Sequence, residues 1–135
     1  MDSPKVVLAH GCFDPLHIGH VWHLKAAREL GDVLVIAVTK DRSVNKGPGR
    51  PVFTELERAE MVEPYCDRWV LADDSLDALI QVDPHLFVKG REYQGKIEAA
   101  HAEYCAARGI KIVFTDTKKY SSTKLLHHYD RPGPG

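Results

Sequence analysis

The sequence contains few cysteines, and none of them forms a Cys-x-x-Cys pair. The three cysteines, Cys12, Cys66 and Cys105, are widely spaced along the chain. An odd number of distant cysteines argues against a disulfide framework and is typical of a reducing compartment. We therefore predict a cytoplasmic location.

Neither sign of charge predominates in this chain. Its 18 Lys and Arg residues are balanced by 19 Asp and Glu residues, which gives a formal net charge of −1. The basic footprint by which proteins bind nucleic acids or anionic membranes is therefore missing. The longest apolar runs, such as residues 33–38, are too short to span a bilayer, and residues 1–5 lack the basic and apolar regions of a signal peptide. We expect neither a nucleic-acid partner nor a membrane partner.

Short apolar runs alternate with helical patterns along all 135 residues. The predicted strands are residues 5–9, 33–38, 68–71, 86–88 and 111–114. The predicted helices are residues 21–30, 54–63, 76–82, 97–108 and 122–129. The strand runs are rich in Val, Ile and Leu without polar alternation, which is typical of strands buried on both faces. The succession predicts an α/β fold with a doubly wound, five-stranded parallel sheet, in one domain over residues 1–130 followed by a flexible tail at 131–135.

Two histidines follow the first predicted strand. Residues 11–15 form a predicted turn, and His17, Gly19 and His20 come directly before the first predicted helix. A strand, a glycine-bearing turn and a helix N-terminus are together typical of a phosphate-binding site. A neutral imidazole still offers one N–H donor, and a glycine lets the backbone approach the phosphate closely. The alternative is that both histidines are structural.

A zinc site is a second alternative for the same region. His10, Cys12 and His23 would add ligand atoms to the two histidines. Their spacing matches no compact zinc ligand set, and no second cluster supplies thiolates. We therefore predict no protein metal site.

Three further segments come after predicted strands and carry hydrogen-bond donors. Residues 39–51 form a long connection that is rich in Lys, Arg, Gly and Pro. Residues 88–93 (Val-Lys-Gly-Arg-Glu-Tyr) are suited to lining a nucleobase pocket. Residues 120–124 (Tyr-Ser-Ser-Thr-Lys) open the last predicted helix, either as simple N-caps or as a phosphate site. Open α/β sheets bind their ligands at the carboxyl edge, where such loops lie.

Taken together, these motifs resemble the cytidylyltransferase-like nucleotidyltransferase family over residues 5–128. The motifs are Gly11-Cys-Phe-Asp-Pro-Leu-His-Ile-Gly-His20, Lys46-Gly-Pro-Gly-Arg-Pro51, Glu57-Arg58, Val88-Lys-Gly90 and Ser121-Ser-Thr-Lys124. Within the family the chain most resembles adenylyltransferases that activate heptose 1-phosphate, and more distantly the glycerol-3-phosphate cytidylyltransferases. It departs from the heptose enzymes at Arg91-Glu92-Tyr93, where their pattern is Gly-Asp-Tyr, and along residues 94–114.

The resemblance implies a Rossmann-like nucleotidyltransferase fold and the transfer of a nucleoside monophosphate from an NTP to an acceptor phosphate, with release of pyrophosphate. The catalytic residues implied are His17, His20, Lys46 and Lys124. The nucleotide-binding residues implied are Gly11, Cys12, Phe13, Asp14, Gly19, Lys89, Gly90, Arg91, Ser121, Ser122 and Thr123. The substrate-binding residues implied are Asp41 and Arg58. The resemblance also implies Mg²⁺ carried by the NTP, and a homodimer.

The favoured prediction is adenylyl transfer to a sugar 1-phosphate. One alternative is cytidylyl transfer to a polyol phosphate or a phosphonate. An alternative of another class is a binding module that holds a nucleotide without turning it over. The partners predicted for either transfer reaction are the NTP and a small phosphorylated or phosphonate substrate.

Overall fold

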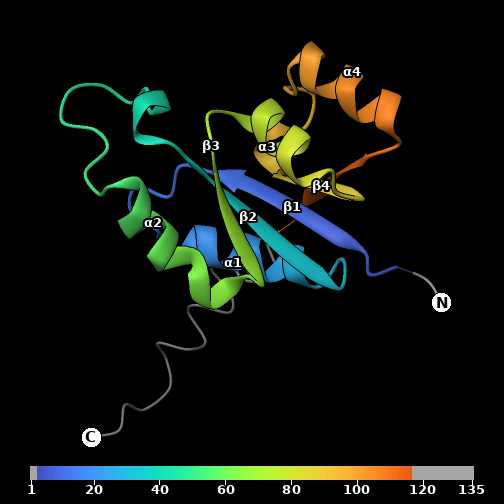
Figure 1. Cartoon of the computed structure of the whole chain (residues 1–135), viewed down its shortest axis with the longest axis horizontal. Coiled ribbons are helices and arrows are strands. Elements are labelled where there is room, and N and C mark those ends of the chain that lie inside the picture. The colour runs from blue at the N-terminus through green and yellow to red at the C-terminus, as the bar shows by residue number, and fades with distance from the viewer. Residues whose placement is uncertain (1–2, 117–135) are drawn as a thin grey trace, which may run out of the picture.

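The computed structural model describes residues 3–116, and a five-stranded parallel sheet forms their centre (Figure 1). The strands are β1 (Val6–Gly11), β2 (Val33–Thr39), β3 (Arg68–Ala72), β4 (Leu86–Gly90) and β5 (Lys111–Thr115). Their order across the sheet is β3-β2-β1-β4-β5, and every neighbouring pair is parallel. The chain therefore winds outward from β1 in one direction and then in the other, which confirms the predicted doubly wound sheet.

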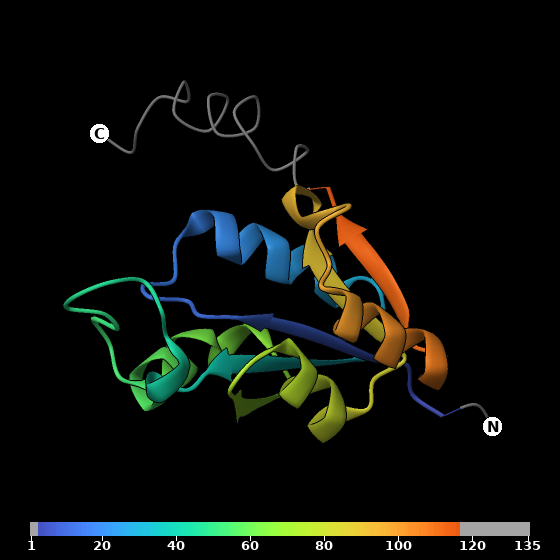
Figure 2. The same ribbon diagram turned by 90° about the horizontal axis from the view of Figure 1, so that it is seen from above.

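Helices cover both faces of the sheet (Figures 1 and 2). The helices α1 (Ile18–Arg28) and α2 (Glu55–Val62) lie on one face, and α3 (Ser75–Val82) and α4 (Ala99–Arg108) lie on the other. Successive residues of a strand point to opposite faces, so each face has its own core. Val7 packs with the α1 and α2 residues, whereas Leu8 packs with those of α3 and α4.

The first helix begins three residues earlier than predicted, at Ile18. The reason is that His17 serves as its N-cap, a role that the sequence pattern did not suggest for histidine. The helix ends at Arg28, and Gly31, which follows it, is needed for packing. A Cβ on Gly31 would lie 2.6 Å from Val7 Cγ2 and 2.8 Å from the Lys5 carbonyl oxygen.

Three short 3-10 helices add to the predicted elements: η1 (Asp41–Ser43), η2 (Glu63–Tyr65) and η3 (Arg91–Tyr93). Two of them follow β2 and β4, so they shape the carboxyl edge of the sheet. The predicted helix at 122–129 and the predicted tail at 131–135 lie outside the described residues. Among residues 3–116, no helix has the length and apolarity needed to cross a bilayer.

Arg58 is the largest of the side chains that are fully buried. Its guanidinium Nη1 donates to the Cys12 carbonyl (2.9 Å), Nε donates to the Phe53 carbonyl (2.9 Å), and Nη2 donates to Asp41 Oδ1 (2.8 Å). One side chain on α2 therefore joins the turn after β1, the segment before α2 and the 3-10 helix after β2.

We expect Arg58→Met to lower the free energy of unfolding by about 3 kcal/mol, because two part-buried carbonyls and one carboxylate would lose the donor that the buried guanidinium supplies. Urea denaturation followed by circular dichroism measures this change. Arg108→Met is the matched control, since Arg108 pairs with Asp83 at 3.4 Å on the surface and its loss should cost less than about 1 kcal/mol. Equal stability changes in the two variants would contradict the role given to Arg58.

Candidate active site

A two-lobed cleft lies at the carboxyl edge of the sheet. It consists of two adjoining cavities with volumes of about 440 and 330 Å³. The residues that line both cavities are His10, Gly11, Cys12, Lys46, Lys89 and Tyr93. These residues come from the ends of β1 and β4 and from the segments after β2 and β4, so the cleft lies where the direction of winding reverses.

The lobes differ in the side chains that line them. The larger, here called the histidine lobe, is lined beyond the shared residues by Phe13, His17, Gly19, His20, His23, Gly90, Glu92 and Thr115. The smaller, here called the hydroxyl lobe, is lined by Thr39, Ser43, Val44, Asn45, Asp73, Asp74, Ser75, Glu98 and His101.

His17 and His20 form the N-terminal cap of α1 with their own rings. Nδ1 of His17 accepts from the Gly19 N–H at 3.1 Å, and Nδ1 of His20 accepts from the His17 N–H at 3.1 Å. The rings stack with their centroids 3.6 Å apart and their planes at 24°. Because both Nδ1 atoms accept, each neutral ring must carry its proton on Nε2. The cap thus fixes two Nε2–H donors side by side at the N-terminus of α1.

Both donors are available at neutral pH without protonation of the second ring. Burial, followed by the nearby charges of His17, Lys46 and His23, lowers the pKa of His20 to about 4. The neutral ring keeps its Nδ1 lone pair for the cap and its Nε2–H for a ligand. The helix dipole adds partial positive charge at the same point.

Two lysines lie where the lobes join. Lys46 comes from the segment after η1, and Lys89 comes from β4. The Lys89 ammonium lies 4.3 Å from the centroid of the Tyr93 ring. Burial lowers the pKa of Lys89, and the negative charges of Glu92 and Glu98 partly offset this lowering. This junction is therefore suited to anionic groups that enter from both lobes.

Asp14 holds the downstream end of the loop that bears Lys46. Its carboxylate accepts from the N–H groups of Val52 (2.8 Å) and Phe53 (2.9 Å) and from Arg50 Nε (2.8 Å). Burial alone would raise the pKa of Asp14, but the hydrogen bonds from Arg50, Phe53 and Val52 lower it to about 2. The loop between these anchors contains Gly47 and Gly49 at φ values of +100° and +77°, which favour glycine.

His10 lines both lobes. Its Nδ1 is 2.8 Å from Ser75 Oγ, and its Nε2 is 3.1 Å from Thr39 Oγ1. The Thr39 hydroxyl also lies 3.2 Å from the Gly11 carbonyl oxygen, to which it can donate. Burial, together with the charge of Lys89, lowers the pKa of His10 to about 4. The neutral ring therefore ties β1 to β2 and α3.

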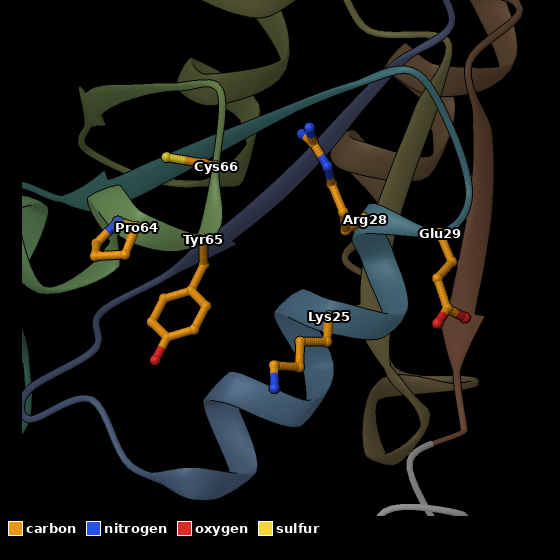
Figure 3. A pocket seen from close by; sticks show the side chains of 6 residues that line it. All are labelled: Lys25, Arg28, Glu29, Pro64, Tyr65 and Cys66. Carbon is orange, nitrogen blue, oxygen red and sulfur yellow. The ribbon is translucent and has the colours of Figure 1, made fainter.

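Another cavity of about 410 Å³ lies apart from this cleft, between α1 and the segment that precedes β3 (Figure 3). Lys25, Arg28 and Glu29 come from one side, and Pro64, Tyr65 and Cys66 come from the other. Burial raises the pKa of the Cys66 thiol, so it is not an activated thiolate. None of the residues predicted for function lines this cavity.

A sequence model of the family described as cytidylyltransferase-like matches residues 8–127. The chain belongs to the cytidylyltransferase-like family. The match takes in the whole two-lobed cleft.

Named relatives of this cytidylyltransferase-like domain are much longer than the chain itself. It is 45% identical over 128 residues to the bifunctional protein HldE of Aliivibrio salmonicida, covering 90% of this chain and 27% of that protein. It is 37% identical over 128 residues to the bifunctional protein HldE of Desulfatibacillum aliphaticivorans, covering 90% of this chain and 26% of that protein. The chain therefore spans about a quarter of the length of these curated relatives.

Solved structures share the fold of the cytidylyltransferase-like domain. The lipopolysaccharide core biosynthesis protein from Thermoplasma volcanium superposes with a TM-score of 0.70 at 31% identity, covering 84% of this chain and 98% of that chain. A protein with unknown function from Archaeoglobus fulgidus superposes with a TM-score of 0.63 at 29% identity, covering 87% of this chain and 93% of that chain.

Many of the residues predicted for this cytidylyltransferase-like site lie together. Those that line the cleft are Gly11, Cys12, Phe13, His17, Gly19, His20, Lys46, Lys89 and Gly90. Ser121, Ser122, Thr123 and Lys124 lie outside the described residues. Thr115 and His101 also line the cleft and were not predicted, whereas Glu92 belongs to the predicted segment 88–93. His10 and His23 were considered only as zinc ligands.

Four predicted residues do not line either lobe: Asp14, Asp41, Arg58 and Arg91. Asp14 holds the Lys46 loop, and Arg58 is fully buried with its donors directed to protein atoms. Asp41 accepts from Arg58, and the exposed Arg91 lies 3.4 Å from Asp116. In this arrangement these four residues position the cleft or lie beside it, and their predicted binding roles stay predictions.

We expect Lys46→Met to raise the pKa of His20, because it removes one of the positive charges that lower it. Proton NMR of the imidazole gives the titration midpoint, which we expect at about 4 in the unchanged protein. Lys25→Met is the matched control, since Lys25 lies on the same helix but lines the separate cavity. An unchanged His20 midpoint in Lys46→Met would mean that the loop does not bring Lys46 to the histidines.

Proposed function

We propose that this domain transfers an adenylyl group from ATP to a sugar 1-phosphate and releases pyrophosphate. The observation that carries the proposal is the pair of Nε2–H donors at the start of α1, beside a cleft whose two lobes meet at Lys46 and Lys89. The histidine lobe would hold the nucleotide, and the hydroxyl lobe would hold the acceptor.

The reaction needs positioning and charge neutralisation more than proton transfer. An oxygen of the acceptor phosphate forms a bond to the α-phosphorus as the bond to the pyrophosphate oxygen breaks, and the electron pair leaves with pyrophosphate. The acceptor is already an anion, so no general base has to be found. The Nε2–H groups of His17 and His20 would donate to the α-phosphate and the departing oxygen, where negative charge increases.

Lys46 and Lys89 would oppose the repulsion between the two substrates. Both reacting phosphates are negative, and they have to approach within bonding distance. Two ammonium groups at the junction of the lobes lower this barrier more effectively than they would in open water, because the cleft reduces screening. Ser121, Ser122, Thr123 and Lys124 are proposed to hold the outer phosphates.

A magnesium ion is proposed to arrive with the nucleotide and to supply further charge neutralisation on the phosphates. Among residues 3–116, no three His, Cys, Asp or Glu side chains are grouped as a metal site. Asp14 is engaged by Arg50, Val52 and Phe53. Phosphate oxygens and water are the ligands that suit such an ion, since Mg²⁺ commonly keeps several waters.

A phosphorylated sugar is the proposed acceptor. Support comes from the likeness of residues 46–51 and 88–90 to enzymes that activate heptose 1-phosphate, and from a structural relative named as a lipopolysaccharide core biosynthesis protein. The hydroxyl lobe presents Asn45, Glu98 and His101, whose side chains suit sugar hydroxyls. A cytoplasmic homodimer is also proposed from the family resemblance.

Pyrophosphate release tests the proposed activity directly. Four NTPs would be assayed against sugar 1-phosphates, polyol phosphates and phosphonates, with Mg²⁺ present. We expect release only when ATP and a sugar 1-phosphate are present together. Pyrophosphate release with CTP and a polyol phosphate would contradict adenylyl transfer and support the cytidylyl alternative. Nucleotide binding without any pyrophosphate release would favour the binding module.

We expect His17→Asn and His20→Ala each to lower kcat by about 100-fold to 1,000-fold, the usual cost of one transition-state donor. Asparagine at position 17 is a good N-cap, so the first variant keeps the helix start while removing Nε2–H. Steady-state pyrophosphate release measures the change. His85→Ala is the control, because His85 accepts from the Val6 N–H at the start of β1 and does not line the cleft. Full turnover in either active-site variant would contradict the roles of His17 and His20.

A further inference from the structure

Glu98 stands at the N-terminus of α4 without capping that helix. The side chain of an N-cap residue usually accepts from a backbone N–H of the first turn, as Thr54 does at α2 and Asp74 does at α3. The Glu98 side chain makes no such hydrogen bond. It lines the hydroxyl lobe instead, with 76% of the side chain exposed. The fold therefore does not use this carboxylate to hold the start of the helix.

His101 lies against the Glu98 carboxylate, one turn further along α4. Its Nε2 is 3.4 Å from Glu98 Oε2, and only 12% of the His101 side chain is exposed. Both side chains line the hydroxyl lobe, and neither lines the histidine lobe. Because the imidazole is largely enclosed, it limits the directions that the carboxylate can take. Within residues 3–116 the other carboxylate oxygen, Oε1, has no hydrogen-bond partner, so it is open to a ligand.

The other two carboxylates of this lobe already hold the fold. Asp73 accepts from Arg42 at 2.7 and 2.8 Å and from Ser43 at 2.7 Å. Asp74 caps α3 through the Asp77 N–H. A ligand at either carboxylate would compete with these contacts. Of the three carboxylates that line the lobe within the described part of the chain, Glu98 is therefore the one without a structural task.

Glu98 also lies near the lysines at the junction of the lobes. Burial lowers the pKa of Lys89, and the negative charges of Glu92 and then Glu98 act against this lowering. The hydroxyl lobe has a volume of about 330 Å³, at the small end of the range of about 300–1,000 Å³ for small-molecule sites, so it is suited to one sugar ring. An acceptor whose phosphate lies at Lys46 and Lys89 would bring its other end toward Glu98.

We propose that Glu98, positioned by His101, accepts hydrogen bonds from hydroxyl groups of the acceptor and thereby selects a polyhydroxylated ring phosphate over phosphates without hydroxyls. Hydrogen bonds from a hydroxyl to a carboxylate are charge-assisted and stronger than neutral ones. An ammonium group would also suit a carboxylate, but Lys46 and Lys89 repel a second cation in this lobe. The inference rests on the proposed function, because it takes the hydroxyl lobe as the acceptor site. Glu98 is a specificity residue, and no step of catalysis is assigned to it.

Calorimetric titration tests this selection without turnover, both in the free protein and with a non-hydrolysable ATP analogue bound. The probes are the 1-phosphates of glucose, mannose and galactose. Cyclohexyl phosphate supplies a ring of similar size without hydroxyls, and phosphoethanolamine supplies an ammonium group. We expect at least one sugar phosphate to bind about tenfold more tightly than both reference compounds, the usual gain from a charge-assisted hydrogen bond. Tighter binding of phosphoethanolamine, or no preference for any sugar phosphate in either titration, would overturn the inference.

Glu98→Gln identifies the residue responsible, because it removes the charge and keeps the shape of the side chain. We expect the preference for the sugar phosphate over cyclohexyl phosphate to fall to within about threefold. Loss of the Glu98 charge also acts on Lys89, but this weakens both phosphates alike and cancels in their ratio. Glu103→Gln is the matched control, since Glu103 is an exposed residue of the same helix that lines neither lobe. A retained ratio in Glu98→Gln, or an equal loss in Glu103→Gln, would overturn the proposal.

The positioning role of His101 is tested by a pair of substitutions. His101→Leu should reduce the preference for the sugar phosphate by about threefold, because the carboxylate loses the group that restricts it. His101→Gln should restore most of the preference, since its amide can still donate to Glu98. An equal loss in both variants would contradict positioning through this contact.

Steady-state pyrophosphate release separates a failure of this inference from a failure of the proposed function. With ATP and the sugar phosphate that binds most tightly, we expect Glu98→Gln to raise the KM for the sugar phosphate about tenfold and to leave kcat within about twofold, since the carboxylate acts away from the reacting atoms. Turnover with an unchanged KM in Glu98→Gln would overturn the inference and leave the transfer reaction standing. The binding preference without any pyrophosphate release would contradict the transfer reaction and still support the role of Glu98.

Discussion

The buried guanidinium of Arg58 is the contact on which the geometry of the cleft depends. It joins the turn after β1, the segment before α2 and Asp41 after β2, with none of its surface exposed. The Asp14 carboxylate secures the neighbouring loop in a similar way, through two backbone N–H groups and Arg50. Charged groups that do not line the cavity therefore set the positions of the Cys12 turn and of Lys46.

The three histidines of the lobe show how one side-chain type supplies different chemistry. His17 and His20 use Nδ1 to accept from backbone N–H groups, so they present donors. His23 contacts the Thr115 hydroxyl through Nδ1 at 2.7 Å, so its ring joins α1 to the end of β5. The neighbouring backbone groups, rather than the rings themselves, decide which ligand atoms His17 and His20 can bind.

Much of the fold could be predicted from the sequence, because buried parallel strands leave apolar runs and glycine-bearing turns leave local patterns. The His17–His20 motif could be placed for the same reason. The parts that could not be predicted depend on contacts distant in the chain. Nothing near Arg58 indicates that it is buried beneath Cys12 and Phe53, and nothing near His23 indicates Thr115 as its partner. The start of α1 was placed three residues too late because histidine is rarely an N-cap.

The self-capping of α1 also has a consequence for how ligand binding and local order are coupled. An anion that accepts from Nε2–H shifts electron density toward the imidazole ring, which makes Nδ1 a stronger acceptor. Hydrogen bonds in such a chain strengthen one another, so each Nδ1 bond to the backbone gains when the far side of its ring is occupied. The first turn of the helix is then most rigid when the site is filled, and the rings transmit occupancy to the backbone without any change of shape.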